Sequence, residues 1–98
     1  MASFVLAFRA TPGRAMPEGA EQAWGAWFEQ LGSAIADRGN RVGRVARVDA
    51  PGSAPDTEVL TGYVVLNASD LDSALTVAKG CPGLASGVSV EVAEVVDA

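Results

Sequence analysis

Residues 57–80 read TEVLTGYVVLNASDLDSALTVAKG, and they carry the strand and the helix that decide the fold. The first part, residues 57–67, is rich in Val, Leu, Thr and Tyr and is apolar at both alternating positions, which is typical of a central strand. The second part predicts a helix that Ser69 caps, with Asp72 reaching back as in a capping box, and that Gly80 ends as its C′ residue. The stripe expected to be buried in this helix comprises Leu71, Ala74, Leu75 and Ala78.

A strand and a long helix are predicted upstream of this segment. Residues 3–9 (SFVLAFR) form a short apolar run that a Thr-Pro-Gly turn closes, as expected for a buried strand. A helix is predicted from Pro17 to Arg38, with Gly39 in the left-handed conformation after its end. Its apolar residues follow helical spacing and are interpreted as core, not as a cofactor site: Trp24, Trp27, Phe28, Leu31 and Ile35.

Two more strands and a loop complete the pattern. Residues 41–48 (RVGRVARV) alternate imperfectly between arginine and valine, which favours an edge strand with one solvated face. Residues 49–56 (DAPGSAPD) contain two prolines, a glycine and a serine, and are predicted to form a loop. Residues 88–96 (VSVEVAEVV) predict the last strand.

The order strand, helix, strand, strand, helix, strand indicates an α+β fold of the ferredoxin-like βαββαβ type, a four-stranded antiparallel sheet with two helices on one face. Two helices cover only one face of such a sheet. Three of the predicted strands are apolar at both alternating positions, so the second face also needs cover. We therefore expect a homodimer in which a second copy supplies it.

Composition bounds the domain and its partners. A chain of 98 residues is one domain's worth, so residues 1–98 are predicted to form a single domain. The formal charge of −5 opposes binding to nucleic acid or to an anionic membrane. Cys81 is the one cysteine, so no internal disulfide or cysteine-built metal site is expected. No cofactor motif and no membrane-spanning run is found, and a cytoplasmic location is expected.

The stretch from Leu60 to Val92 resembles the YCII-related family of small proteins and its DGPF-type members. The resemblance rests on Gly62-Tyr63 opening a strand, on Asp70-Leu71-Asp72-x-Ala74 in a helix, on Ala78-Lys79-Gly80-Cys81-Pro82, and on Ser89-Val90-Glu91-Val92. The first helix, with its Trp24-x-x-Trp27 pair, is also similar. The resemblance implies a ferredoxin-like subunit that forms a dimeric α/β barrel. It also implies kinship with small enzymes that use a His-Asp pair, some of which act on chlorinated aromatic degradation products.

Candidate site residues are few because the chain contains no histidine. Acid-base chemistry near neutral pH then needs a carboxylate, thiol or phenol with a shifted pKa. Glu91 lies mid-strand among valines and is a candidate pocket acid or base; the alternative is a structural cross-strand ion pair with Arg9 on the neighbouring strand. Tyr63, the one tyrosine, is a candidate ligand-binding hydroxyl or a core aromatic.

Other polar groups have simpler interpretations. Cys81 follows a helix C-terminus, where the helix dipole disfavours a thiolate, so a buried structural role is expected. Arg41, Arg44 and Arg47 either bind an anion or protect an edge strand from aggregation.

The residues leave three functions open. The first is a homodimeric YCII-like domain that binds a small molecule at the sheet face or at the dimer interface. The second is a small lyase or hydrolase that uses Glu91 with Arg9 or Tyr63. The third is a purely structural or protein-interaction module. Whether any reaction is catalysed stays undecided at this point, and the missing histidine inclines the interpretation toward binding.

Overall fold

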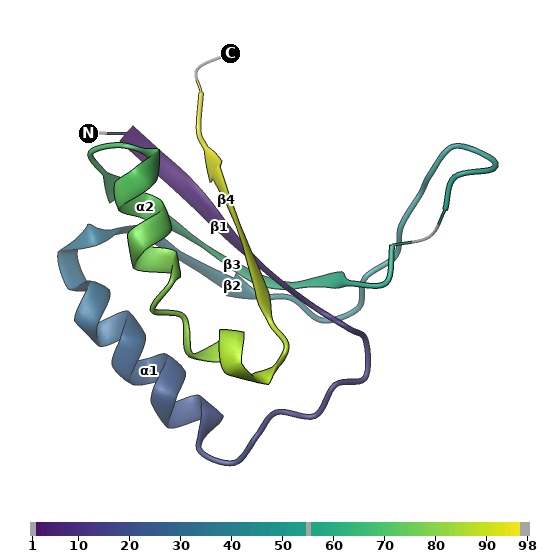
Figure 1. Cartoon of the computed structure of the whole chain (residues 1–98), viewed down its shortest axis with the longest axis horizontal. Helices are drawn as coiled ribbons and strands as arrows, with labels where there is room; N and C mark the ends of the chain where they lie inside the picture. The colour runs from purple at the N-terminus through teal and green to yellow at the C-terminus, as the bar shows by residue number, and fades with distance from the viewer. Residues whose placement is uncertain (1, 55, 97–98) are drawn as a thin grey trace.

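A computed structural model describes residues 2–54 and 56–96 of the chain. Its elements follow the predicted order (Figure 1): β1 (Ala2–Ala10), α1 (Ala20–Leu31), β2 (Ile35–Arg41), β3 (Val59–Ala68), α2 (Leu71–Ala78) and β4 (Ser89–Glu94). Two short 3-10 turns, Gly32–Ala34 and Pro82–Ser86, precede β2 and β4. The ferredoxin-like βαββαβ fold is thereby confirmed.

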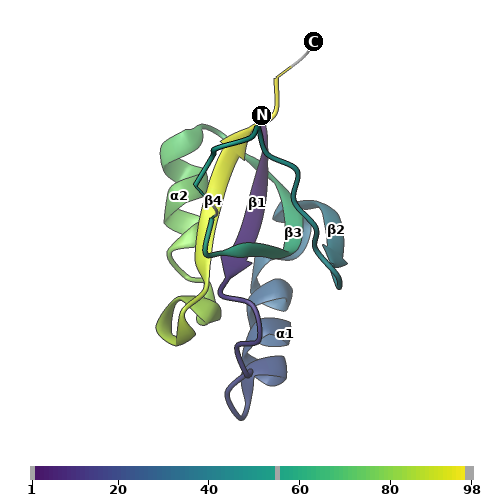
Figure 2. The same ribbon diagram turned by 90° about the vertical axis from the view of Figure 1, so that its right-hand side faces the viewer.

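The four strands form one antiparallel sheet in the order β2-β3-β1-β4. Side chains on β1 and β3 alternate between buried and half-buried, so that one face of the sheet meets the core and the other stays open. Both helices pack on the core face, and Figure 2 shows α2 alongside β4. The open face comprises the alternate residues of three strands, among them Val5, Ala7, Tyr63, Val65, Glu91 and Ala93.

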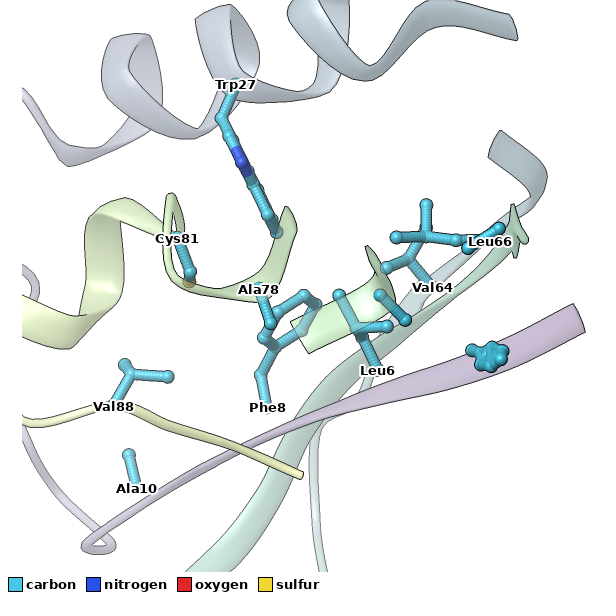
Figure 3. Close-up of a cluster of buried hydrophobic side chains, with 12 residues drawn as sticks. Leu6, Phe8, Ala10, Trp27, Val64, Leu66, Ala78, Cys81 and Val88 are labelled. Carbon is cyan, nitrogen blue, oxygen red and sulfur yellow. The ribbon is translucent and has the colours of Figure 1, made fainter. Parts of the chain in front are cut away.

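The core lies between the sheet and the helices and contains no buried polar or charged residue among those described. Trp27 reaches from α1 toward Phe8 on β1, with Leu6 and Val64 rising from the sheet beside them (Figure 3). Cys81 lies in the same cluster, and burial raises the pKa of its thiol. The buried set is Phe4, Leu6, Phe8, Ala10, Trp27, Val64, Leu66, Ala68, Ala74, Ala78, Cys81 and Val88.

The predicted boundary between the first helix and the second strand is wrong. The helix ends at Leu31 and not at Arg38, because Gly32, with φ of 52°, turns the chain and donates its N–H to the carbonyl of Phe28. Ile35 keeps to the helical spacing of the apolar stripe, yet it lies on β2 opposite Leu66. Its side chain packs on the same core as the helix stripe, so periodicity alone does not separate the two assignments.

The prediction of a strand at residues 41–48 is also wrong, because the second strand begins and ends earlier in the chain. Residues Ile35–Arg41 pair with β3 and form the edge strand instead. The last hydrogen bond between the two segments runs from the Val42 N–H to the carbonyl of Thr61 at 3.0 Å. The chain beyond it, residues 42–54 and 56–58, is an arm that extends away from the sheet and the helices (Figure 1). The arm helps to explain a radius of gyration of 14.3 Å, against about 13 Å for a compact chain of 100 residues.

Two details of the second helix also differ from prediction. Asp70, not Ser69, is the N-cap, and its carboxylate accepts the N–H of Ser73 at 2.8 Å. Ala74 and Ala78 are buried as expected, whereas Leu71 and Leu75 are 46% and 39% exposed. The helix is short and lies at one side of the sheet, so the residues that pack on the core are Ala74, Val77 and Ala78. Gly80 has no left-handed φ; the chain leaves the helix through Lys79 in the right-handed region.

Candidate functional site

An open cleft of about 1050 Å³ lies beside α1, where the loop after β1 and the end of β2 approach each other. The loop contributes residues 11–14 and Met16, and β2 contributes residues 38–41. The first residues of the arm, Val42, Gly43 and Val45, line the same cleft. It is larger than a second hollow of about 280 Å³ between the start of α1 and the turn before β4, so it is the first candidate for a ligand site.

Aromatic side chains form the floor of this cleft. Trp24 and Phe28 project from α1 and are half-buried, and their ring centroids lie 6.3 Å apart at 80°. Trp24 also meets Phe8 of β1 edge to face, at 4.9 Å and 87°. These contacts hold both rings in fixed orientations while part of each ring stays open to the cleft. One side of the apolar stripe of α1 therefore packs in the core, and the other side lines the cleft.

Three arginines surround the aromatic floor. Arg14 comes from the loop after β1, and Arg38 and Arg41 come from β2. The guanidinium carbon of Arg38 lies 5.5 Å from the centroid of the Phe28 ring, a cation–π arrangement. Glu21 is the one acidic residue in the lining.

The sequence did not single out Arg14 or Arg38 as site residues. It gave Arg41 two interpretations, an anion site shared with Arg44 and Arg47 or the protection of an edge strand. Arg14 and Arg38 are 24 positions apart in the sequence, so only the folded chain brings them to one cleft. A surplus of positive charge in the segments that flank the first helix was the one available signal, and it is weak.

The predicted ion pair between Arg9 and Glu91 does not form. Both residues lie on the open face of the sheet, as their parity predicted, but Arg9 is opposite Ser89 and Glu91 is opposite Ala7. The guanidinium of Arg9 instead donates to the carboxylate of Asp56 at 2.8 Å and to the carbonyl of Glu58 at 3.0 Å. The partner of Arg9 thus comes from the arm, 47 positions away, where sequence parity gives no guidance.

Tyr63 and Glu91 lie on either side of one small residue. Ala7 on β1 pairs with Tyr63 of β3 on one side and with Glu91 of β4 on the other. Tyr63 lines the cleft, and its hydroxyl accepts a long hydrogen bond of 3.4 Å from the Asn40 amide. Glu91 is exposed and does not line the cleft. Of the three predicted residues, only Tyr63 is in the cleft lining, and its ring lies on the open face of the sheet, opposite to the face that Trp24 and Phe28 cover.

Asp56 holds the base of the arm. One carboxylate oxygen accepts the Glu58 N–H at 3.1 Å, and the other accepts Arg9 at 2.8 Å and Arg47 at 3.0 Å. The Glu58 N–H, followed by the hydrogen bond from Arg47 and the positive charge of Arg9, lowers the pKa of Asp56 below its usual value.

This arrangement predicts an acid-sensitive arm. A carboxyl group whose pKa is lower in the folded than in the unfolded state stabilises the folded state. This stabilisation is complete above the ordinary aspartate pKa of about 3.9 and is lost as the pH falls through the lower native pKa. We expect the ¹³C carboxyl signal of Asp56 to titrate below that ordinary value. In Arg47→Gln its midpoint should rise, and in Arg44→Gln, which removes the same charge from the same arm without a contact to Asp56, it should stay. Equal midpoints in all three proteins would contradict the role given to Arg47.

Metal and membrane features are not found in the described ranges. Residues 2–54 and 56–96 contain no group of three or more His, Cys, Asp or Glu side chains placed to hold a metal ion. No helix in these ranges has the length and apolar character needed to cross a membrane.

Comparisons with known proteins place the fold. No protein family and no curated protein sequence matches the chain. Among solved structures, the chain is similar to 5-chloro-2-hydroxyhydroquinone dehydrochlorinase (TftG) from Burkholderia phenoliruptrix AC1100 in complex with 2,5-dihydroxybenzoquinone. The TM-score is 0.61 with 15% sequence identity, over 98% of this chain and 95% of that chain. At this identity the likeness shows a shared fold, and membership of the YCII-related family stays a prediction.

Proposed function

We propose that this protein is a YCII-like small-molecule-binding domain whose ligand enters the cleft beside α1. The observation that carries the proposal is the cleft itself, about 1050 Å³ in volume, with a floor of oriented aromatic rings and a few polar groups around it. Ligand sites of roughly 300–1,000 Å³ with mostly apolar walls and few polar groups are typical of proteins that bind small molecules. The similarly folded dehydrochlorinase holds 2,5-dihydroxybenzoquinone, a planar molecule that a cleft of this volume admits.

The geometry favours this function over the lyase or hydrolase that would use Glu91. A pocket acid or base needs to lie within hydrogen-bond reach of its substrate. Glu91 is exposed on the open sheet face, outside the cleft lining, and Arg9 is engaged by Asp56. Tyr63 is the one of these three residues in the cleft lining, and its ring lies on the open face of the sheet, where its hydroxyl accepts a hydrogen bond from Asn40.

Binding is tested by ¹⁵N NMR with 2,5-dihydroxybenzoquinone and with neutral hydroquinone as probes. The chain has two tryptophans, so their indole N–H signals are assigned with one variant, Trp24→Phe. We expect at least one probe to shift the Trp24 signal in a saturable manner. Gly43→Leu should weaken that binding several-fold by filling the cleft, because nothing lies within 4 Å of a Cβ at Gly43. Ala50→Leu, an exposed arm position outside the lining, is the matched control.

The proposal fails if neither probe shifts Trp24, or if Gly43→Leu and Ala50→Leu bind equally well.

The second part of the proposed function is a homodimer built on the open sheet face. Its centre is apolar, with Val5, Ala7, Val65 and Ala93 on three adjacent strands. Both helices pack on the other face of the sheet. An apolar surface of this kind is a typical site of protein association, and a second copy presents an identical surface to it.

We therefore expect light scattering to give about twice the 10.0 kDa of one chain at micromolar concentration. Ala93→Glu should shift the species toward 10.0 kDa, because it places a charge at the apolar centre of the interface. Ala85→Glu makes the same change at an exposed position on the turn before β4 and should leave the mass unchanged. A wild-type protein that stays at one chain's mass would overturn the dimer and leave the cleft proposal intact.

A further inference from the structure

The charge of the cleft is opposite to the charge of the protein. Three of the seven basic residues in the chain line it, Arg14, Arg38 and Arg41, against one of the twelve acidic residues, Glu21. The chain as a whole carries a formal charge of −5. A cationic cleft on an acidic protein focuses a positive potential at one place, which attracts small anions while the remaining surface repels extended polyanions.

The three arginines are also unpaired. Arg9 and Arg47 both form ion pairs with Asp56, so this chain does neutralise guanidinium groups where a carboxylate is within reach. None of Arg14, Arg38 and Arg41 lies in an ion pair within residues 2–54 and 56–96. Their bidentate hydrogen-bonding capacity toward a carboxylate or a similar oxyanion is therefore unused.

Arg14 carries the clearest evidence for a missing acceptor. Its Nε is buried and has no hydrogen-bond acceptor among the described residues. Its Nη1 donates only to the carbonyl of the adjacent Ala15, at 3.3 Å. The side chain lies against the turn before β4, since a Cβ built on Gly87 would sit 3.6 Å from the Arg14 Cδ. A buried, unsatisfied donor on a charged group is unfavourable, so a shift of the Arg14 side chain that brings its N–H groups to an anion oxygen in the cleft would be favoured.

The aromatic floor adds a second requirement. Trp24 and Phe28 leave half-exposed ring surface beside these cations, and the Arg38 guanidinium is already stacked over Phe28. Ring surface of this kind binds another flat ring by offset or edge-to-face contact. A ligand that satisfies both features has a planar ring and a negative charge at its edge.

We propose that the cleft binds planar aromatic anions, such as aromatic carboxylates and phenolates, and that Arg14 is the residue that selects for the negative charge. This inference rests on the proposed small-molecule function and names its ligand class. The ring of the ligand lies against Trp24 and Phe28, and its anionic group accepts hydrogen bonds from the Arg14 guanidinium. Arg38 and Arg41 add positive charge at the rim.

Three probes separate the two requirements. Benzoate has both the ring and the charge, benzamide keeps the ring and nearly the same shape without the charge, and cyclohexanecarboxylate keeps the charge without the aromatic ring. Their affinities are measured on the Trp24 indole N–H signal and on the backbone signals of the cleft. We expect benzoate to bind at least tenfold more tightly than either of the other two, and its affinity to fall with added salt.

Charge-matched variants then test Arg14. Arg14→Gln should bring benzoate down to the affinity of benzamide and leave benzamide unchanged. Lys79→Gln removes the same charge outside the cleft lining and should keep the preference for benzoate within twofold. Arg38→Gln, at an exposed rim position, serves as a second variant if Arg14→Gln lowers the thermal midpoint; it should reduce the preference for benzoate in part.

Each failure points to a different conclusion. Equal affinity for benzoate and benzamide would overturn the charge selection and leave small-molecule binding in the cleft standing. A full preference for benzoate in both Arg14→Gln and Arg38→Gln would overturn the assignment of these arginines. Absence of binding by all three probes, together with no response to 2,5-dihydroxybenzoquinone or hydroquinone, would overturn the proposed function as well.

Discussion

Replacing Trp27 with alanine is expected to lower the free energy of unfolding by about 3–5 kcal/mol, the usual loss for truncating a large core aromatic. Trp27 is 6% exposed, and its ring lies 5.8 Å from Trp24, 5.6 Å from Phe28 and 6.0 Å from Phe8. It joins α1 to the sheet and to the end of α2, because a Cβ on Gly80 would lie 3.2 Å from its Nε1. The truncation therefore leaves a cavity where three parts of the fold meet (Figure 3).

Urea denaturation measures the effect, and Gln30→Ala is the control. Gln30 is an exposed residue on the same helix, and its replacement should change the free energy of unfolding by less than about 0.5 kcal/mol. Small domains have total stabilities of about 5–15 kcal/mol, so Trp27→Ala is expected to be substantially less populated in its folded form when warmed. A loss as small as that of Gln30→Ala would contradict the place of Trp27 in the core.

Gly39→Ala is expected to be the most damaging of the glycine substitutions on β2 and β3. Gly39 has φ of 64°, and its N–H donates to the Asp37 carboxylate at 2.8 Å. A Cβ at this position would overlap the backbone carbonyl oxygen of Tyr63 on the neighbouring strand. Left-handed strain and a clash with immovable backbone together should lower the free energy of unfolding by about 2 kcal/mol or more.

Gly43→Ala is a matched control four residues further along the chain. Nothing lies within 4 Å of a Cβ at Gly43, and its φ is not left-handed. Its replacement should be neutral or slightly stabilising, because alanine reduces the freedom of the unfolded chain. Amide hydrogen exchange should show the loss in Gly39→Ala concentrated in the pairing of β2 with β3. Equal stability of the two variants would contradict the close packing of the Gly39 backbone against Tyr63.

The order of elements was predictable from the sequence because most segments have a single good interpretation. Residues 3–9 are too short and apolar for anything but a buried strand, and they fall inside β1. Residues 57–67 largely coincide with β3 for the same reason. The strand faces also followed from alternation: Val90 and Val92 pack on the core, and Glu91 points to the open face. Local pattern and tertiary packing agree in these segments.

The region around β2 was not predictable because two interpretations fit it equally. Gly32 and Gly39 both have left-handed φ and both suit the end of a helix, and only the pairing with β3 decides between them. Arginine and valine do alternate in residues 41–48, but the edge of β3 already pairs with Ile35–Arg41. The competition between two segments for one sheet edge is a tertiary effect that no local window contains.

The candidate site was less predictable than the fold. Tyr63 was found because a single hydroxyl-bearing ring on a central strand is conspicuous. Arg14 was missed because it lies in a loop whose path depends on where α1 begins. The pairing of Arg9 with Asp56 was missed because the arm folds back to β1 across a long stretch of sequence. Contacts that loops bring together carry no periodic signal.

The buried thiol of Cys81 is a built-in chemical probe of unfolding. Because burial raises its pKa, the thiolate that reacts with alkylating or disulfide reagents is scarce at neutral pH and shielded by neighbouring side chains. The chain holds no other cysteine, so each modification event reports one molecule that has opened its core. The rate of labelling at Cys81 therefore measures how often the domain unfolds under native conditions, and a cysteine introduced on the surface could be tagged selectively while Cys81 stays intact.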